Sequence, residues 1–132
     1  MMPALAGWYE YMQSHDATAL WNLLDPDAVF ESPVVHTPQR GRPIAFKYLS
    51  SAEQVLGGEN FRYVGEWLNE RGAVLEFTTE IEGVAINGVD MLGFSTDGRR
   101  IVTFKVMVRP LKAINLLHRL MGEQLARAAP PA

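Results

Sequence analysis

The chain of 132 residues contains no cysteine. This absence excludes disulfides, thiolate nucleophiles and cysteine-ligated metals, and it fits a reducing compartment, so we expect a cytoplasmic protein. Basic charge is also sparse, because 12 Lys and Arg stand against 15 Asp and Glu, and only Arg99 and Arg100 are adjacent. Without a basic patch to follow phosphates, nucleic acid is not an expected partner.

Long apolar runs and metal-ligand motifs are missing too. No stretch approaches the roughly 20 residues that cross a bilayer, and the opening MMPALAGWYEYM has no basic leader. We therefore expect neither a membrane anchor nor a signal peptide. The histidines lack HxH or HxxxH spacing, and no glycine-rich phosphate motif occurs. The sequence therefore predicts no metal and no cofactor.

The apolar periods predict helices first and strands afterwards. Helical spacing extends from Leu5 to Met12, follows the N-cap Asp16 over residues 17–24, and returns after Pro43 with Ile44, Tyr48, Ala52 and Val55. A short strand over residues 28–32 precedes that third helix. The period then changes to two, which predicts strands over residues 60–68, 73–82, 85–95 and 100–108. A closing helix over residues 111–128 and a loose proline-rich tail follow.

This order of elements predicts an α+β fold. We expect a single domain, residues 1–132, in which three N-terminal helices cover a curved antiparallel sheet and a C-terminal helix closes the chain. A chain of this length buries roughly two thirds of its unfolded surface around one core.

The segment GVDMLGF, residues 88–94, places a carboxylate in an apolar strand. Because side chains alternate, Asp90 shares a face with Leu92 and Phe94. If the preceding hairpin turns at Glu82-Gly83, Asp90 lies opposite Leu75, and if it turns at Asn87-Gly88, Asp90 lies opposite Ala85. Both pairings predict that Asp90 faces the helices.

The following hairpin also has two possible registers. A two-residue turn at Asp97-Gly98 would set Lys105 opposite Asp90, whereas a bulge at Gly98 would set Phe104 there. We favour the bulge, because it groups Val102, Phe104, Val106 and Val108 inside. Asp90 then has no cationic neighbour in its sheet. Burial of an unpaired carboxylate costs several kcal/mol, so we expect a raised pKa and a neutral, proton-donating acid.

Aromatic residues surround the predicted position of Asp90. Phe61, Tyr63 and Trp67 share one face of the first long strand, and a curved sheet under helices can leave an apolar hollow for a small hydrophobic molecule. The predicted pocket residues are Trp8, Tyr9, Met12, Ser32, Tyr48, Tyr63, Trp67, Phe77, Leu92 and Phe104. The simpler interpretation is that these aromatics are ordinary core packing.

His36 is the candidate proton acceptor. It lies in the loop after the strand of residues 28–32, near the expected opening of the cone, and an imidazole titrates close to neutral pH. A lone loop histidine is more commonly exposed or structural, so both interpretations stay open.

Three segments resemble a known superfamily. VFESPV (29–34), GRPIAFKYL (41–49) and the run from Ile86 to Leu117 resemble the nuclear transport factor 2-like superfamily, in particular its SnoaL-like and ketosteroid-isomerase-like members. The resemblance extends from Trp8 to about Leu125. It implies a cone-shaped α+β domain with a deep apolar pocket, commonly a homodimer. The superfamily includes isomerases, polyketide cyclases, epoxide hydrolases, dehydratases and members with no catalysis.

The resemblance also assigns residue roles. Asp90 matches the acid of the ketosteroid isomerase oxyanion hole, which an apolar site keeps neutral so that it donates a hydrogen bond. The position of the general base is Ser32, and the position of the oxyanion tyrosine is Trp8, with Tyr9 next to it. A serine hydroxyl without a neighbouring histidine is too weak a base. Standard ketosteroid isomerase activity is therefore not expected.

The outer sheet face suggests a homodimer. Two-fold contact could set an acidic strand of one copy against a basic strand of the other. The residues are Glu76, Thr78, Glu80, Thr103, Lys105, Met107 and Arg109. Two functions remain open: an isomerase, cyclase or dehydratase in which Asp90 donates a proton, and a non-catalytic ligand-binding or dimeric assembly domain.

Overall fold

The computed structural model describes residues 1–127, in which it contains four helices and six strands. Residues 128–132, the predicted helix end and proline-rich tail, lie outside the described residues. The helices are α1 (Pro3–Ser14), α2 (Ala17–Leu23), α3 (Arg42–Leu56) and α4 (Leu111–Arg127). The strands are β1 (Leu24–Glu31), β2 (Gln39–Arg40), β3 (Arg62–Asn69), β4 (Gly72–Ile81), β5 (Val84–Phe94) and β6 (Ile101–Arg109).

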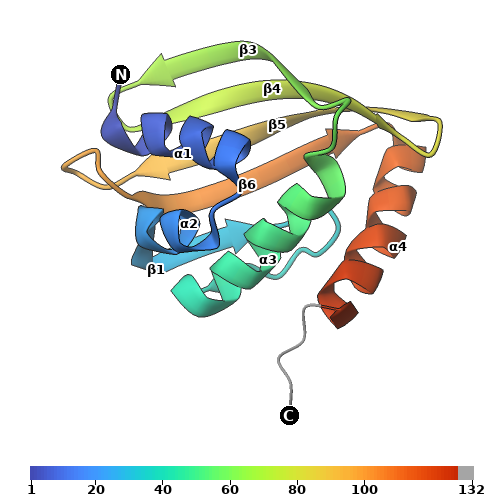
Figure 1. The fold of residues 1–132 in the computed structure, drawn as a ribbon, viewed down its shortest axis with the longest axis horizontal. Helices are drawn as coiled ribbons and strands as arrows, with labels where there is room; N and C mark the ends of the chain where they lie inside the picture. The colour runs from blue at the N-terminus through green and yellow to red at the C-terminus, as the bar shows by residue number, and fades with distance from the viewer. Residues whose placement is uncertain (128–132) are drawn as a thin grey trace.

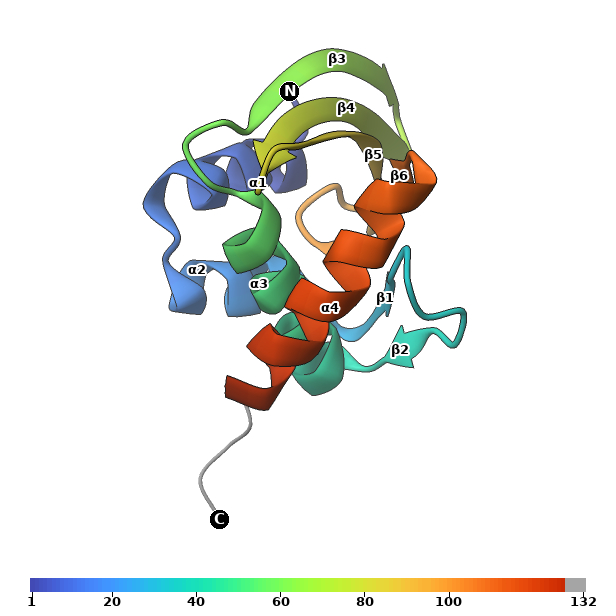
Figure 2. The same ribbon diagram turned by 90° about the vertical axis from the view of Figure 1, so that its right-hand side faces the viewer.

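The strands form one mixed sheet in the order β2-β1-β6-β5-β4-β3 (Figure 1). β3 to β6 are antiparallel, as their short turns predict, but β1 runs parallel to β6. Antiparallel pairing is expected where a short hairpin joins two strands. β1 follows α2 and is separated from β3–β6 by β2 and α3, so no hairpin requires it to run antiparallel to β6. The sheet curves around α1 and α3 (Figure 2). The predicted α+β cone is therefore confirmed, with one parallel strand pair in its sheet.

The boundary between α1 and α2 follows from local chemistry. Pro3 occupies the first turn of α1, where a missing N–H costs nothing. α1 ends at His15, which has a left-handed φ of 55°. The carboxylate of Asp16 then accepts hydrogen bonds from the amides of Thr18 and Ala19, at 3.0 and 3.4 Å. Asp16 is thus the N-cap that the sequence predicts.

The buried face of α3 differs from the predicted face. Ile44 is 38% exposed, whereas its neighbour Ala45 is buried. The inner stripe passes through Ala45, Leu49, Ala52, Glu53 and Leu56. The helix is therefore rotated by about one residue from the expected orientation, and this rotation turns the carboxylate of Glu53 into the interior.

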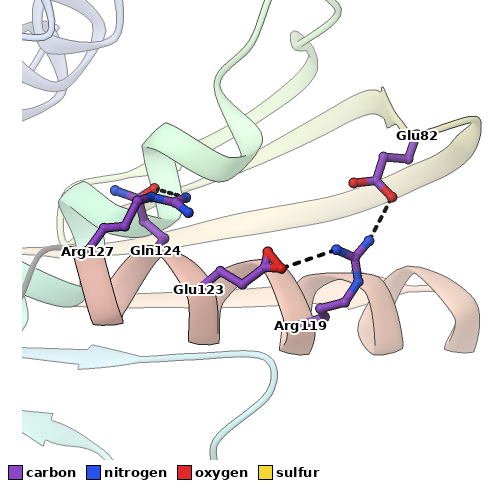
Figure 3. A network of polar contacts seen from close by, with 5 residues as sticks. All are labelled: Glu82, Arg119, Glu123, Gln124 and Arg127. Carbon is purple, nitrogen blue, oxygen red and sulfur yellow. Dashed lines mark hydrogen bonds and ion pairs between the residues drawn. The ribbon is translucent and has the colours of Figure 1, made fainter.

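α4 packs along α3 and is also tied to the turn between β4 and β5. Arg119 forms an ion pair with Glu82 of that turn at 2.7 Å, and a second pair with Glu123 at 3.4 Å (Figure 3). These groups are exposed, so each pair contributes little to stability. Buried Leu117 and Met121 attach the helix to the core instead.

Candidate functional site

Asp90 lies at the centre of β5 and points toward the helices. It is opposite Leu75 of β4, the partner expected from the Glu82-Gly83 turn, and only 2% of its surface is exposed. Leu92, on the same face, is buried as well. The predicted inward orientation of Asp90 is confirmed.

The register between β5 and β6 differs from both predicted alternatives. Val106 lies opposite Asp90, and Phe104 lies opposite Leu92. Neither short turn forms, because Asp97 organises a longer loop by accepting hydrogen bonds from the Ser95 hydroxyl and the Arg99 amide. Phe104 and Val106 nevertheless share the inner face, so the neighbour of Asp90 in β6 is apolar. The expectation that no cation lies opposite Asp90 in its sheet is correct.

The carboxyl group of Asp90 is held by a chain of hydrogen bonds. The Tyr63 hydroxyl donates to Asp90 Oδ2 at 2.5 Å, and the indole Nε1–H of Trp8 donates to the Tyr63 oxygen at 2.9 Å. The chain links α1, β3 and β5 through the interior. Trp8 Nε1, the Tyr63 hydroxyl and Asp90 Oδ2 each have a hydrogen-bond partner, which lowers the cost of burying them.

A second buried acid, Glu53, lies close enough to interact with Asp90 electrostatically. It comes from the inner face of α3 and is 3% exposed. Its Oε2 has no hydrogen-bond partner among the described residues. The sequence pattern predicts one buried acid only, Asp90. An inner face of α3 that passes through Leu49, Ala52 and Leu56 also contains Glu53. Placing the apolar face one residue further along the helix would therefore have predicted that Glu53 is buried.

Burial raises the pKa values of this cluster. For Asp90, burial raises the pKa to about 7, although the hydrogen bond from Tyr63 opposes the shift. For Glu53, burial and then the charge of Asp90 raise the pKa well above its usual range. Burial, followed by the charges of Asp90 and Glu53, also raises the pKa of Tyr63. Near neutral pH the cluster therefore retains protons that exposed carboxylates would lose.

The predicted aromatic pocket is filled by its own side chains. The ring centroid of Trp8 lies 4.7 Å from that of Phe104, and Phe30 lies 6.2 Å from Phe104. Phe77 stacks on Phe61 at 5.1 Å. The predicted residues Trp8, Phe77, Leu92 and Phe104 are buried core residues, whereas Tyr9, Met12, Tyr48 and Tyr63 are half-buried around them.

The space that remains beside this core is a narrow crevice. It has a volume of about 10 Å³ and lies between β1, β6, α3 and α4. Ser32 and Phe30 line it on one side, and Leu117 and Met121 of α4 line it on the other. Val106, which is opposite Asp90, also contributes to its wall. The crevice is smaller than the small hydrophobic molecule that the sequence predicts as a ligand.

The expectation that Trp67 shares the inner face with Phe61 and Tyr63 is wrong. The pairing of β3 with β4 shifts between Tyr63 and Gly65, and this bulge inverts the alternation of side chains. Trp67 is 59% exposed and lies over Gly65, where a Cβ atom would meet its ring at 2.7 Å. Glu66 takes the opposite face and accepts a hydrogen bond from the hydroxyl of Tyr9.

His36 lies in the loop that follows β1, and Ser32 lies at the end of that strand. His36 is exposed, and both residues line a surface groove of about 410 Å³ together with Lys105 and Met107. The Ser32 hydroxyl accepts a hydrogen bond from the Val34 amide at 3.1 Å. Within residues 1–127, no hydrogen bond links His36 to Asp90. The structure thus brings Asp90 together with Trp8 and Tyr63, but not with His36.

No group of three or more His, Cys, Asp or Glu side chains in residues 1–127 is arranged to hold a metal ion. Among the helices of that same range, none combines the length and apolar character needed to cross a bilayer.

Comparison with solved structures identifies relatives across most of the chain. A steroid delta-isomerase from Pseudomonas aeruginosa is 38% identical, with 94% of this chain and 90% of that chain covered and a TM-score of 0.86. An uncharacterised protein with a cystatin-like fold from Silicibacter pomeroyi is 27% identical, with coverage of 94% and 86% and a TM-score of 0.84.

A SnoaL-like polyketide cyclase described from Shewanella putrefaciens shares the fold at 17% identity, with coverage of 94% and 84% and a TM-score of 0.62. No protein-family model matches the chain. No curated protein matches it either.

The curved sheet, its helical cover and these relatives define the class as an NTF2-like α+β domain. The chain belongs to the nuclear transport factor 2-like superfamily, in its SnoaL-like and ketosteroid-isomerase-like branch.

Proposed function

We propose that this protein is an enzyme of the isomerase, cyclase or dehydratase kind that acts on a small, largely apolar molecule with a carbonyl group. The observation that carries the proposal is the state of Asp90. It is buried without a cation opposite it in the sheet, and burial raises its pKa to about 7. A neutral carboxylic acid in an apolar site can donate a hydrogen bond to a carbonyl oxygen.

In the proposed reaction, Asp90 stabilises a developing enolate. A C–H bond next to the carbonyl breaks, its electron pair moves toward the carbonyl oxygen, and protonated Asp90 donates a hydrogen bond to that oxygen. The proton passes to His36 or to a group of the substrate, and its return to another carbon completes an isomerisation. The hydrogen bond from Tyr63 fixes the Asp90 carboxyl group in position.

The relatives support this class of reaction. The 38% identical structure is described as a steroid delta-isomerase. This chain departs from the ketosteroid isomerase pattern at two positions, because Ser32 stands at the position of the base and Trp8 stands at the position of the oxyanion tyrosine. We therefore propose the reaction type and leave the substrate open among ketones and steroids.

A ligand would reach Asp90 through the crevice between β1, α3 and α4. Val106 joins the two places, because it lines the crevice and lies opposite Asp90 in the sheet. Since the crevice holds only about 10 Å³, side chains such as Leu117 and Met121 must move to admit a ligand. The apolar lining matches a largely apolar substrate.

We also propose that the protein forms a homodimer through the outer face of the sheet. Trp67 and Met107 are exposed on that face, at 59% and 51%. Lys105 and Glu31 form an ion pair there at 3.7 Å, and a groove of about 450 Å³ runs between Trp67 and Lys105. An exposed tryptophan beside apolar and paired charged groups is typical of a protein interface.

The close packing of the interior favours a second candidate, a non-catalytic binding or assembly domain. In that case the chain from Trp8 through Tyr63 to Asp90 ties α1 to the sheet and serves stability alone. The two candidates differ in what they expect when a ketone is added, because only the first requires turnover.

The test combines binding and turnover on a panel of β,γ-unsaturated ketones that includes steroids. Wild-type protein, Asp90→Asn, Asp90→Ala and His36→Ala are compared, with Glu59→Gln in the exposed loop after α3 as the control. Formation of the conjugated ketone is followed by ultraviolet absorbance, and binding is followed by NMR. Turnover that is lost in both Asp90 variants but kept in Glu59→Gln supports the enzyme. Binding without turnover in the wild type supports the non-catalytic domain.

A further inference from the structure

A second opening lies on the helical side of the molecule, between α1 and α3. This groove has a volume of about 560 Å³. Tyr11 and Phe46 provide aromatic walls, and Glu53 and Gly57 line it from α3 and its C-terminal end. It is distinct from the crevice beside Val106, which opens between β1, α3 and α4.

Glu53 is the unusual member of this groove. The residue is 3% exposed, and its Oε2 lacks any partner among residues 1–127. Buried polar atoms in native proteins are nearly always hydrogen-bonded, so an unpaired one points to a missing group. Glu53 differs in this respect from Asp90, whose Oδ2 accepts a hydrogen bond from the Tyr63 hydroxyl.

Oε2 lies just beneath the wall of this groove. Gly57 lies in the wall beside it, and a Cβ atom at that position would be 3.4 Å from Oε2. Because glycine has no side chain, little but main chain separates the carboxyl group from the open space. Neither titratable neighbour of Glu53 stabilises its ionised form. After burial, the charge of Asp90 further raises the pKa of Glu53, and the charge of Glu53 further raises the pKa of Tyr11.

Glu53 is expected to carry a proton. Among residues 1–127 no hydrogen-bond donor reaches Oε2 of Glu53, whereas Asp90 accepts a hydrogen bond from the Tyr63 hydroxyl. A neutral carboxylic acid both donates and accepts a hydrogen bond. It therefore suits an uncharged oxygen better than it suits an anion, and the aromatic walls suit an apolar body.

We propose that the groove between α1 and α3 binds a small neutral molecule whose carbonyl or hydroxyl oxygen accepts a hydrogen bond from Glu53. Tyr11 and Phe46 contact the apolar part of that molecule. This site is separate from the reaction proposed at Asp90, and it requires neither turnover nor movement of α4.

The test uses acetophenone and toluene as probes, because they share an aromatic ring and differ in the carbonyl oxygen. Binding is measured by NMR titration of the Ala17 methyl group and the Gly57 amide, both at the groove. In the wild type, acetophenone binds about tenfold more tightly than toluene, the value of one hydrogen bond to a buried group.

Variants of Glu53 decide whether the carboxyl group is responsible. Glu53→Gln keeps a donor of nearly the same shape and retains the preference for acetophenone. Glu53→Met keeps the length but removes the donor, so acetophenone falls to the affinity of toluene. Glu70→Gln, at an exposed residue of the turn between β3 and β4, leaves the preference intact.

Three results would overturn the proposal. The first is equal affinity of the wild type for the two probes, which needs no variant and so remains decisive if Glu53→Met fails to fold. The second is an unchanged preference in folded Glu53→Met. The third is a set of acetophenone shifts confined to Ser32 and Met121, which would place binding in the other crevice and would support the function proposed for Asp90 instead.

Discussion

Tyr63 of β3 donates a hydrogen bond of 2.5 Å to Asp90 of β5, across the intervening strand β4. The two residues are 27 positions apart in sequence. The curvature of the sheet allows this bond, because it brings side chains of two strands that are not neighbours within hydrogen-bonding distance. Trp8 continues the chain into α1.

Replacement of Tyr63 by phenylalanine is expected to destabilise the fold and to raise the pKa of Asp90. The change removes the donor to Asp90 and the acceptor of the Trp8 N–H, so the free energy of unfolding should fall by about 1–3 kcal/mol. The pKa of Asp90 should rise, because the bond from Tyr63 lowers it. Urea denaturation measures the first effect, and NMR titration of the carboxyl carbon measures the second.

Tyr9→Phe is the matched control for that experiment. Tyr9 also donates to a carboxylate, that of Glu66, but in an exposed setting. Its loss should change stability by less than about 0.5 kcal/mol. Equal effects of the two substitutions would contradict the importance assigned to the buried bond.

Stability should fall as the pH rises from about 4 to 7, and Asp90 should cause part of that fall. The pKa of Asp90 is raised to about 7 in the folded state, against about 3.9 in an unfolded chain. The folded state therefore binds more protons across this window, and stability present below the unfolded pKa is lost as the pH approaches the folded pKa. The loss is on the order of 4 kcal/mol for a shift of this size.

Asp90→Asn isolates this contribution. The difference in unfolding free energy between wild type and variant, measured in urea at several pH values, should change steeply between pH 4 and 7 and flatten above it. Glu59→Gln, in the exposed loop after α3, should leave the pH profile of the wild type unchanged. A constant difference between wild type and Asp90→Asn would show that Asp90 is ionised throughout.

Ser32→Asp is expected to supply a general base at the position where ketosteroid isomerases have one and this chain has a serine. Ser32 lines the crevice next to Val106, and an aspartate there can still accept the hydrogen bond from the Val34 amide. A positioned general base commonly contributes about 10²–10⁴-fold to a proton-transfer rate. Isomerisation of a β,γ-unsaturated ketone, followed by absorbance, should therefore accelerate at least about a hundredfold.

The control for this gain of function is Ser32→Asn, which has the same shape and no basic carboxylate. If both variants show the same rate, the carboxylate is not placed to take the proton. In that case the crevice would not place a substrate between residue 32 and Asp90.

Met107→Lys should weaken the proposed dimer. Met107 is 51% exposed on the outer sheet face, and a charge buried there between two copies would lack a partner. We expect the dissociation constant to rise at least about tenfold, as for a buried interface residue, and sedimentation velocity measures it. Leu111→Ser, at a 75% exposed residue that begins α4, should have no effect. A wild type that is monomeric at every concentration would contradict the interface.

The inward orientation of Asp90 was predictable because the inference did not depend on a single register. Leu75 and Ala85 were alternative partners, and the alternation expected from the sequence assigned both to the face of Phe77. The structure uses Leu75, whereas Ala85 is exposed and pairs with Glu80 on the outer face. The alternation of side chains then decided the orientation, whatever turn formed. The helix cap at Asp16 was predictable for a similar reason, since the signal is local.

Trp67 and Glu53 show where the sequence was insufficient. The bulge after Tyr63 adds one residue to β3 and inverts all later side chains, and its only sequence signal is Gly65 inside a strand. For α3, apolar residues at neighbouring positions allow two helix phases, and tertiary packing chose the one that buries Glu53. Contacts between distant segments settle both points, and periodicity does not contain that information.

The close packing of Trp8, Phe30 and Phe104 has a kinetic consequence. A ligand can reach Asp90 only after these side chains or α4 move. This opening step limits binding, so the observed association rate should level off at high ligand concentration. The plateau would equal the rate at which the protein opens spontaneously. In the groove at Glu53, which is already open, the rate should keep rising in proportion to concentration.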